Sequence, residues 1–204
     1  MIKLSHRREL YVLMFGVVIV AFLGLVVRPM VAIQSNYLKN RTVIVSQHLN
    51  QISSGREPFA VVVGNSLVER NYVAELCGYR VVNAGVGRAK IDDLTEIARL
   101  VRASHPEIRV LSVGVNDAAA GISVVEFGRA YRKLVAVLEP THVVGITGIQ
   151  SDQYNKEIRG LSGRAIYVEP LADKYLQDDG VHYTTDGSFV WRAGIEQTCA
   201  SSAA

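Results

Sequence analysis

Four short blocks of polar and small residues follow apolar runs, and together they could catalyse acyl transfer. In chain order they are Gly64-Asn65-Ser66-Leu67, Asn83-Ala84-Gly85-Val86-Gly87-Arg88, Gly114-Val115-Asn116-Asp117 and Asp179-Gly180-Val181-His182-Tyr183. A serine hydroxyl is a weak nucleophile at neutral pH unless a nearby base takes its proton. Histidine suits that role, and a carboxylate can hold its other ring nitrogen. We therefore predict a Ser66 nucleophile, a His182 base and an Asp179 that orients the imidazole.

The same blocks contain donors for the oxyanion that forms when a hydroxyl attacks an ester carbonyl. We expect the Ser66 backbone N–H, the Asn116 side-chain amide and a backbone N–H of the 85–88 loop to form this oxyanion hole. Losing one such donor typically costs ~10²–10³ in rate. We assign the loop donor to Gly87, with Gly85 and Arg88 as the alternatives.

Other chemistries with similar motifs fit the sequence less well. The nucleophile elbow of α/β-hydrolases reads G-x-S-x-G, but Val68 stands at its second glycine. The glycines at 85 and 87 do not complete a dinucleotide fingerprint, and no phosphate-binding loop of the Walker type occurs. The histidines and cysteines show no metal-ligand spacing, so we expect neither a metal nor a cofactor. We expect structural, solvated or capping roles for His142, Asp117, Asp178 and Asp186.

Short apolar runs alternate with segments of helical period from residue 59 onward. The expected strands are Phe59–Val63, Arg80–Val82, Arg109–Val113, His142–Ile146 and Ala165–Val168. The expected helices are Leu67–Leu76, Asp92–Ala103, Val124–Leu138, Tyr154–Leu161 and Asp186–Gln197. This alternation predicts an α/β fold with a parallel sheet and helices on both faces. Ligands bind beyond the carboxyl ends of such strands, where the four blocks lie.

With these residues the sequence resembles the SGNH hydrolases, also called GDSL-type esterases. Ser66, a glycine near 85–87, Asn116 and His182 match the four residues that name the family, in the expected order. The resemblance covers roughly residues 59–192. It implies a flavodoxin-like three-layer sandwich with five parallel strands in the order 2-1-3-4-5. It also implies esterase, lipase, thioesterase or carbohydrate-deacetylase activity without a cofactor.

The sequence departs from the family pattern at two positions. Asn65 replaces the aspartate of the usual Gly-Asp-Ser-Leu block, so a charge is lost while the shape is kept. In many relatives a glycine stands five residues after an asparagine, and here Arg88 holds that position, with Gly87 one residue earlier. We expect these differences to modify the site without inactivating it, and we expect Arg88 to place a cation near the acyl pocket.

Residues Leu10 to Val27 carry no charge and are long enough to span the ~30 Å hydrocarbon core of a bilayer. A cleaved signal peptide would end at small residues, but Met30 stands where one is expected, so we favour an uncleaved anchor. Lys3, Arg7 and Arg8 outnumber Arg28, which predicts a cytoplasmic amino end. We expect a cytoplasmic tail (1–9), an anchor (10–27), a helical connector (28–57), a hydrolase domain (58–198) and a tail (199–204).

The composition is that of a globular domain, with 49% hydrophobic and 20% charged residues. The net charge of +3 comes from the first 28 residues, and the rest of the chain is balanced. No basic face is therefore expected, which argues against a nucleic-acid partner.

These observations predict a membrane-anchored serine esterase on the extracytoplasmic (periplasmic) side of the membrane. We expect it to remove short acyl groups, acetyl first, from cell-envelope carbohydrate through an acyl-enzyme on Ser66. The alternatives are an O-acyltransferase that uses the same site and a non-catalytic binding or assembly module.

Cys77 and Cys199 are the only cysteines, and an extracytoplasmic domain could oxidise them to a disulfide. In a flavodoxin-like sheet the first and last helices run on one face, and their carboxyl ends meet at the edge opposite the active site. We expect Cys77 to end the helix that begins at Ser66, and Cys199 to lie just past the last helix. The alternative is a pair of buried free thiols.

Overall fold

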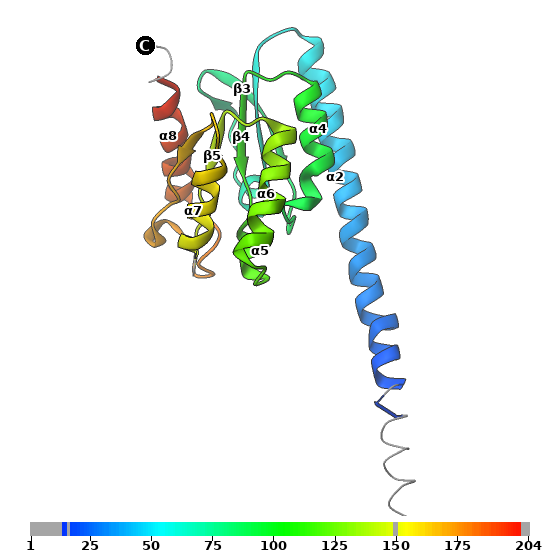
Figure 1. Ribbon diagram of the computed structural model, residues 1–204. Helices are drawn as coiled ribbons and strands as arrows, with labels where there is room; N and C mark the ends of the chain where they lie inside the picture. The colour runs from blue at the N-terminus through cyan, green and yellow to red at the C-terminus, as the bar shows by residue number, and fades with distance from the viewer. Residues whose placement is uncertain (1–13, 16, 149–150, 201–204) are drawn as a thin grey trace, which may run out of the picture. The chain divides into compact units, whose positions relative to one another are not determined.

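A computed structural model of the chain describes residues 14–15, 17–148 and 151–200 (Figure 1). The chain divides into two compact units, Met1–Asn40 and Arg41–Ala204. The second unit contains the β-sheet and all four polar blocks.

The described part of the first unit is helical. A short π-helix, η1 (Leu23–Val27), leads into the long helix α2 (Arg28–Ser54), whose last 14 residues belong to the second unit. The helical stretch Val17–Ser54 has a window of mean hydropathy 2.2 and is long and apolar enough to cross a membrane. The expected anchor 10–27 falls partly on residues 10–13 and 16, which lie outside the described residues.

Six strands form one sheet in the order β2-β3-β1-β4-β5-β6. They are β1 (Phe59–Gly64), β2 (Glu75–Leu76), β3 (Tyr79–Gly85), β4 (Ile108–Ser112), β5 (His142–Val144) and β6 (Ile166–Val168). Strands β3, β1, β4, β5 and β6 are parallel, in the spatial order expected for the five predicted strands. Every residue of the central strand β1 is buried, which explains its unbroken apolar sequence.

The sequence-based prediction is wrong at one edge of the sheet, where β2 pairs with β3 in the antiparallel sense and makes the sheet mixed. The predicted helix Leu67–Leu76 is also wrong, because α3 (Ser66–Arg70) is only five residues long. The Asn83 side chain donates hydrogen bonds to the carbonyls of Val68 (2.7 Å) and Asn71 (3.4 Å). These contacts satisfy carbonyls at the end of the helix and turn the chain toward β2.

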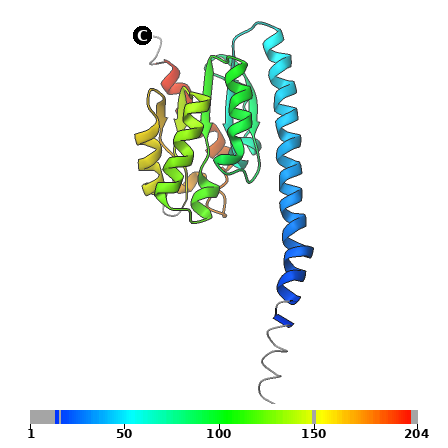
Figure 2. The same cartoon turned by 45° about the vertical axis from the view of Figure 1, so that its right-hand side comes forward.

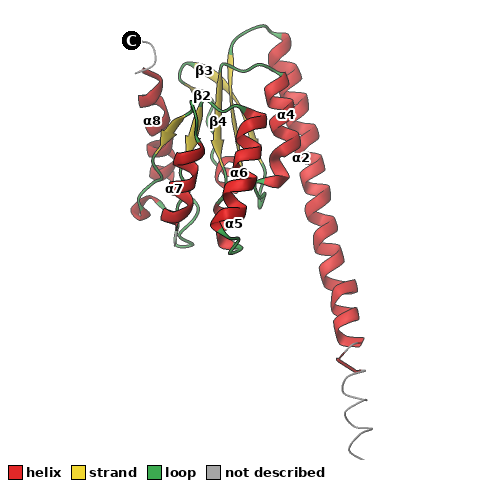
Figure 3. Ribbon diagram, in the orientation of Figure 1, coloured by secondary structure: helices red, strands yellow, loops and turns green. Residues whose placement is uncertain are grey.

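Helices cover both faces of the sheet (Figures 1 and 3). Connections between parallel strands are right-handed, so connections that move in opposite directions across the sheet place their helices on opposite faces. The connections after β3, β4 and β5 run one way, and their main helices lie side by side in Figures 1 and 2. The helices are α4 (Thr95–Ala103), α5 (Val115–Ala119), α6 (Val124–Leu138), α7 (Ser151–Leu161) and α8 (Thr185–Ala200), with the 3-10 turns η2 (Asp92–Leu94) and η3 (Asp173–Tyr175).

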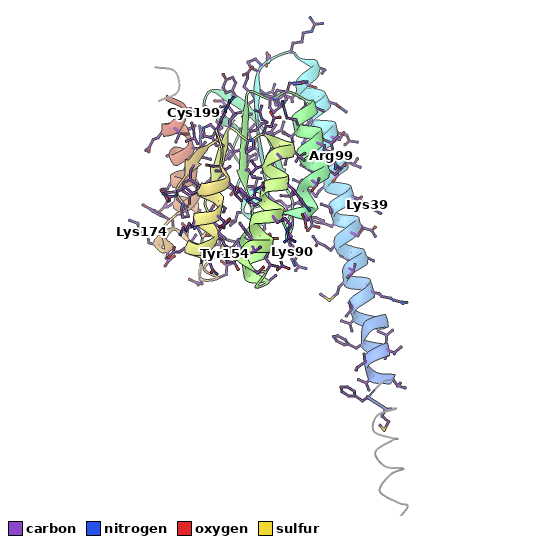
Figure 4. All side chains as sticks on the ribbon, in the orientation of Figure 1. Lys39, Lys90, Arg99, Tyr154, Lys174 and Cys199 are labelled. Atoms are coloured by element: carbon purple, nitrogen blue, oxygen red, sulfur yellow. A yellow bond between two sulfur atoms is a disulfide. The ribbon has the colours of Figure 1, made fainter. Side chains whose placement is uncertain are left out.

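Cys77 and Cys199 form a disulfide with Cα atoms 5.9 Å apart, which confirms the predicted pairing. The expected local structure was different, since Cys77 lies in the turn between β2 and β3 and not at a helix end. Cys199 lies within the last turn of α8, where Figure 4 labels it. The bond therefore fastens the C-terminal helix to the β2–β3 edge of the sheet.

We expect the bond to stabilise the fold, because the two cysteines are 122 residues apart and the cross-link restricts the unfolded chain. Loop-closure entropy for such a length gives an upper figure of roughly 4–5 kcal/mol. The paired substitution of Cys77 and Cys199 by alanine should lower the free energy of unfolding in urea by up to that amount. Reduction of the native protein should have the same effect and should leave the double variant unchanged. Equal midpoints for oxidised and reduced protein would contradict a structural disulfide.

Candidate active site

Ser66 is the first residue of α3 and directly follows the end of β1. Asn65 caps this helix, and its side-chain oxygen accepts a hydrogen bond from the Leu67 N–H at 3.0 Å. Asparagine and aspartate are equally good N-caps, so the missing negative charge does not prevent the helix start. Asn65 is fully buried and Ser66 is 8% exposed. The nucleophile block is thus fixed at the carboxyl end of the central strand.

Asp179 and His182 lie on one tight turn between β6 and α8. The imidazole Nδ1 is 2.6 Å from Asp179 Oδ2, while Asp179 Oδ1 accepts the backbone N–H groups of Val181 and His182, each at 2.9 Å. Gly180 has φ +67°, a conformation that favours glycine and makes the turn possible. The hydrogen bond from the His182 side chain, followed by the two backbone donors, lowers the pKa of Asp179 well below its usual value. The carboxylate is therefore ionised at neutral pH.

The segment that carries His182 is held by hydrogen bonds to the residues just before it. The Gln177 N–H donates to the His182 carbonyl at 2.7 Å, and the Gln177 side chain donates to the Tyr183 carbonyl at 2.8 Å. An antiparallel bridge joins Leu176 to Tyr183. Tyr183 itself is buried, and desolvation raises the pKa of its phenol. This packing restricts the position of the imidazole without help from a regular strand.

The imidazole Nε2 of His182 lies 3.0 Å from Ser66 Oγ, although the two residues are 116 positions apart. The structure therefore brings Ser66, His182 and Asp179 together in one chain of hydrogen bonds. The same arrangement in hydrolases activates the serine through the imidazole and orients the imidazole through the carboxylate.

The loop after β3 carries the remaining backbone donor that the sequence predicts. The Gly85 N–H already donates to the Asn83 side-chain oxygen at 2.9 Å, which argues against Gly85 as the oxyanion donor. Arg88 has φ +63°, a left-handed conformation that is unusual for a residue with a side chain. Such backbone conformations cluster at functional sites.

Asn116 lies in the short helix α5, after the end of β4. Its side-chain amide donates to the Ala89 carbonyl at 2.9 Å and so fastens the far end of the 86–89 turn. An amide group has two N–H bonds, and one hydrogen bond to Ala89 leaves the other for an oxyanion.

The sequence-based reading of Asp117 as a solvated or capping residue is wrong, because this side chain is only 4% exposed. Its carboxylate accepts the backbone N–H of Ile91 at 3.2 Å. Burial raises the pKa of Asp117 to about 6, against the opposing effect of this hydrogen bond. Asp117 and Asn116 therefore hold the loop between β3 and α4 at two successive points. Nothing in the sequence predicts this role, because Asp117 is a single aspartate that follows an asparagine.

Two of the cavities among the described residues lie at opposite ends of the parallel strands. One of about 580 Å³ adjoins Asp179 and is lined by Val115, Thr147 and Leu176 among others. The larger one, about 850 Å³, lies around the disulfide and the beginning of β5, away from the four blocks. His142 lines this second cavity and is buried, which lowers the pKa of its imidazole, so it stands apart from the site. Within residues 14–15, 17–148 and 151–200, no group of three potential ligands is placed to hold a metal.

We expect Asp117 to make stability depend on pH. Its pKa is about 6 in the folded protein and near the ordinary value of 3.8 in the unfolded chain. Between these values the folded state binds more protons, so the unfolding free energy falls as pH rises from about 4 to about 6. A difference of about two pKa units between the folded and unfolded states corresponds to a change of about 3 kcal/mol in the unfolding free energy.

Asp117→Asn keeps an acceptor for Ile91 but never ionises. In urea titrations, the stability of this variant relative to the wild type should therefore increase as pH rises from about 4 to about 6. Asp152→Asn, at an exposed position, is the control and should follow the wild-type profile. Parallel profiles for Asp117→Asn and the wild type would contradict the buried, shifted carboxyl.

Comparisons with known proteins agree with this geometry at the level of fold. No protein-family model matches the sequence, and no curated protein matches it either. Solved structures do match. One is a Streptococcus pneumonia protein described as a platelet activating factor, with a TM-score of 0.63 and 17% identity over 84% of this chain and 99% of that one.

Two further matches are named for ester chemistry. A GDSL-like lipase from Bacteroides thetaiotaomicron has a TM-score of 0.55 and 16% identity, over 77% of this chain and 98% of its own. A family 3 carbohydrate esterase from Clostridium thermocellum has a TM-score of 0.51 and 14% identity, over 72% and 100%. The resemblance seen in the four blocks is thereby confirmed in the fold, and the chain has the architecture of the SGNH hydrolases.

Proposed function

We propose that this protein is a serine esterase whose nucleophile is Ser66. The observation that carries the proposal is the hydrogen-bonded series from Ser66 Oγ through the His182 imidazole to the Asp179 carboxylate, with distances of 3.0 and 2.6 Å. The shared architecture with lipases and esterases supports the same conclusion. This site would work without a cofactor.

In the first half of the reaction, Ser66 Oγ attacks the ester carbonyl carbon and its proton passes to His182 Nε2. The tetrahedral intermediate then collapses, the C–O bond to the alcohol breaks, and the imidazolium returns the proton to the leaving oxygen. The product is an acyl group esterified to Ser66. In the second half, His182 takes a proton from water as the water oxygen attacks the acyl carbon. The bond between the acyl carbon and Ser66 Oγ then breaks, the imidazolium returns the proton to Oγ, and the acid is released.

Negative charge develops on the carbonyl oxygen in both halves of the reaction. The Ser66 N–H, the second N–H of the Asn116 amide and the Gly87 N–H would donate to it. Ser66 opens a helix, and a first-turn N–H has no partner within its own helix. Asp179 stabilises the imidazolium that forms at the same moment, since its carboxylate is ionised and in direct contact with the ring.

The short loops around the site and the predicted membrane anchor support a proposal for the substrate class. The loops around the four blocks are short and rich in glycine, alanine and aspartate, which favours a small acyl group over a fatty acyl chain. We therefore assign short acyl groups, acetyl first, carried on a carbohydrate of the cell envelope. The solved carbohydrate esterase with the same architecture supports this choice.

The location is the extracytoplasmic side of the membrane, with the anchor at 10–27 and the amino end in the cytoplasm. The apolar helix within Val17–Ser54 supports a single-pass anchor. The Cys77–Cys199 disulfide supports an oxidising compartment, because cytosolic thiols are kept reduced.

Ser66→Ala should abolish hydrolysis of p-nitrophenyl acetate without changing the thermal midpoint of the purified protein by much. The loss should concern turnover only, because Asn65 still caps α3. Ser123→Ala is the matched control, since Ser123 caps α6 and its loss costs about 1 kcal/mol of stability but no activity. Wild-type rates in Ser66→Ala would rule out the mechanism.

A reporter enzyme that is active only outside the cytoplasm should be active when fused to the C-terminus of the full chain. The reason is the excess of Lys3, Arg7 and Arg8 over Arg28, which keeps the amino end inside. Replacing these three residues by glutamate should reduce reporter activity. An inactive reporter on the unchanged chain would place the domain in the cytoplasm.

A further inference from the structure

Arg41 lies on α2, in the part of that helix that belongs to the same unit as the sheet. Its guanidinium donates two hydrogen bonds to the Gly85 carbonyl, from Nε at 3.0 Å and from Nη2 at 2.7 Å. The same Nε lies 3.4 Å from Glu69 Oε1 on α3, and the two side chains are only 20% and 23% exposed. Arg41 therefore joins the end of β3 to the helix that begins with Ser66.

Gly85 is packed directly on α3 at this point. A Cβ atom on Gly85 would overlap the backbone of Glu69, so only glycine permits this approach. Asn83 strengthens the same junction, because its side chain accepts the Gly85 N–H at 2.9 Å and donates to the Val68 carbonyl at 2.7 Å. Both polar groups of Gly85 are thus held by side chains, one from Asn83 and one from Arg41.

The carbonyl that Arg41 binds belongs to the same peptide group as the Val86 N–H. That N–H donates to the Gly64 carbonyl at 2.9 Å, at the end of β1 and two residues before Ser66. A cation at the carbonyl end of a peptide group polarises it and strengthens the hydrogen bond at its N–H end. Arg41 therefore tightens the bond that sets the loop after β3 against the strand that leads to the nucleophile.

The 86–89 turn that follows is short and is fixed at both ends. The Ala89 N–H closes the turn on the Val86 carbonyl at 3.1 Å, and Asn116 binds the Ala89 carbonyl at 2.9 Å. Gly87 and Arg88, the two candidate backbone donors to the oxyanion, lie between these fixed points. The position of Val86 depends on the Gly85–Val86 peptide group, and Arg41 holds that peptide group through the Gly85 carbonyl.

We propose that Arg41 is a positioning residue for the oxyanion hole, which it serves by holding the Gly85–Val86 peptide and through it the backbone donor at Gly87 or Arg88. This inference rests on the proposed esterase activity. It assigns to α2, the helix that follows the predicted membrane anchor, a part in the geometry of the active site. It requires no contact between Arg41 and the substrate.

The test is steady-state hydrolysis of p-nitrophenyl acetate by the full chain with Arg41→Met, which keeps the apolar stem and removes every donor. Loss of an oxyanion donor costs ~10²–10³ in rate, and a displaced donor should cost less, so we expect kcat to fall about tenfold. The KM should change less than twofold. The acidic limb of the pH–kcat profile should not move, because the Asp179–His182 pair is untouched.

Arg41→Lys keeps the positive charge but loses the fork of two donors, so it should recover part of the lost kcat. Arg109→Met is the matched control, since Arg109 also donates to two backbone carbonyls, of Glu139 at 2.6 Å and Pro106 at 2.8 Å, but lies at the amino end of β4, away from the carboxyl ends of the strands. It should lower the thermal midpoint as Arg41→Met does and leave kcat unchanged. Equal kcat for the wild type and both Arg41 variants would overturn the proposal, as would equal losses in Arg41→Met and Arg109→Met.

Labelling with an alkyl fluorophosphonate separates failure of this proposal from failure of the proposed function. The probe phosphonylates an activated serine, and the oxyanion donors assist this step. A wild-type protein that is not labelled at Ser66 would refute the esterase site itself. Labelling of wild type and Arg41→Met at the same rate would refute the positioning role alone, and slower labelling of Arg41→Met would support it.

Discussion

The hydrogen bond from Ser66 Oγ to His182 Nε2 is the contact on which the rest of the site depends. It joins the end of the first parallel strand to a turn just before the last helix, so it exists only when the whole sheet has formed. Most of the fold serves to hold Ser66 and His182 in the positions that this contact requires. The buried central strand fixes Ser66, and the 176–183 bridge with its Gln177 hydrogen bonds fixes His182.

A second constraint is the close packing at the carboxyl ends of β1 and β3. A side chain at Gly64 would overlap the Ser112 carbonyl, and one at Gly85 would overlap α3, so the strand ends leave no room for adjustment. Polar side chains complete the arrangement, with Asn83 from β3 itself, Asn116 from α5 and Arg41 from α2. An oxyanion hole held by such a fixed backbone is effective because its donors need not reorganise as charge develops.

The sequence was sufficient to predict the parallel core and the pairing of Ser66, His182 and Asp179, because apolar runs followed by polar blocks report directly on strand ends. It was not sufficient for the short strand β2, since residues 67–76 have helical composition and the break depends on Asn83, a tertiary contact. The burial of Asp117 and the contact of Arg41 with Gly85 depend on distant backbone groups in the same way. The disulfide was predicted correctly although the helix expected to carry Cys77 does not exist.

The central claim is that Ser66 becomes acylated during turnover. Rapid mixing of the full chain with p-nitrophenyl acetate, acid quenching within the first turnover and peptide mapping by mass spectrometry test it directly. The account predicts one acetyl group per protein, located on the peptide that contains Ser66, at a level that falls to zero in Ser66→Ala. Turnover of the ester with no acetylated peptide in the wild type, or with acetyl on another residue, would contradict it.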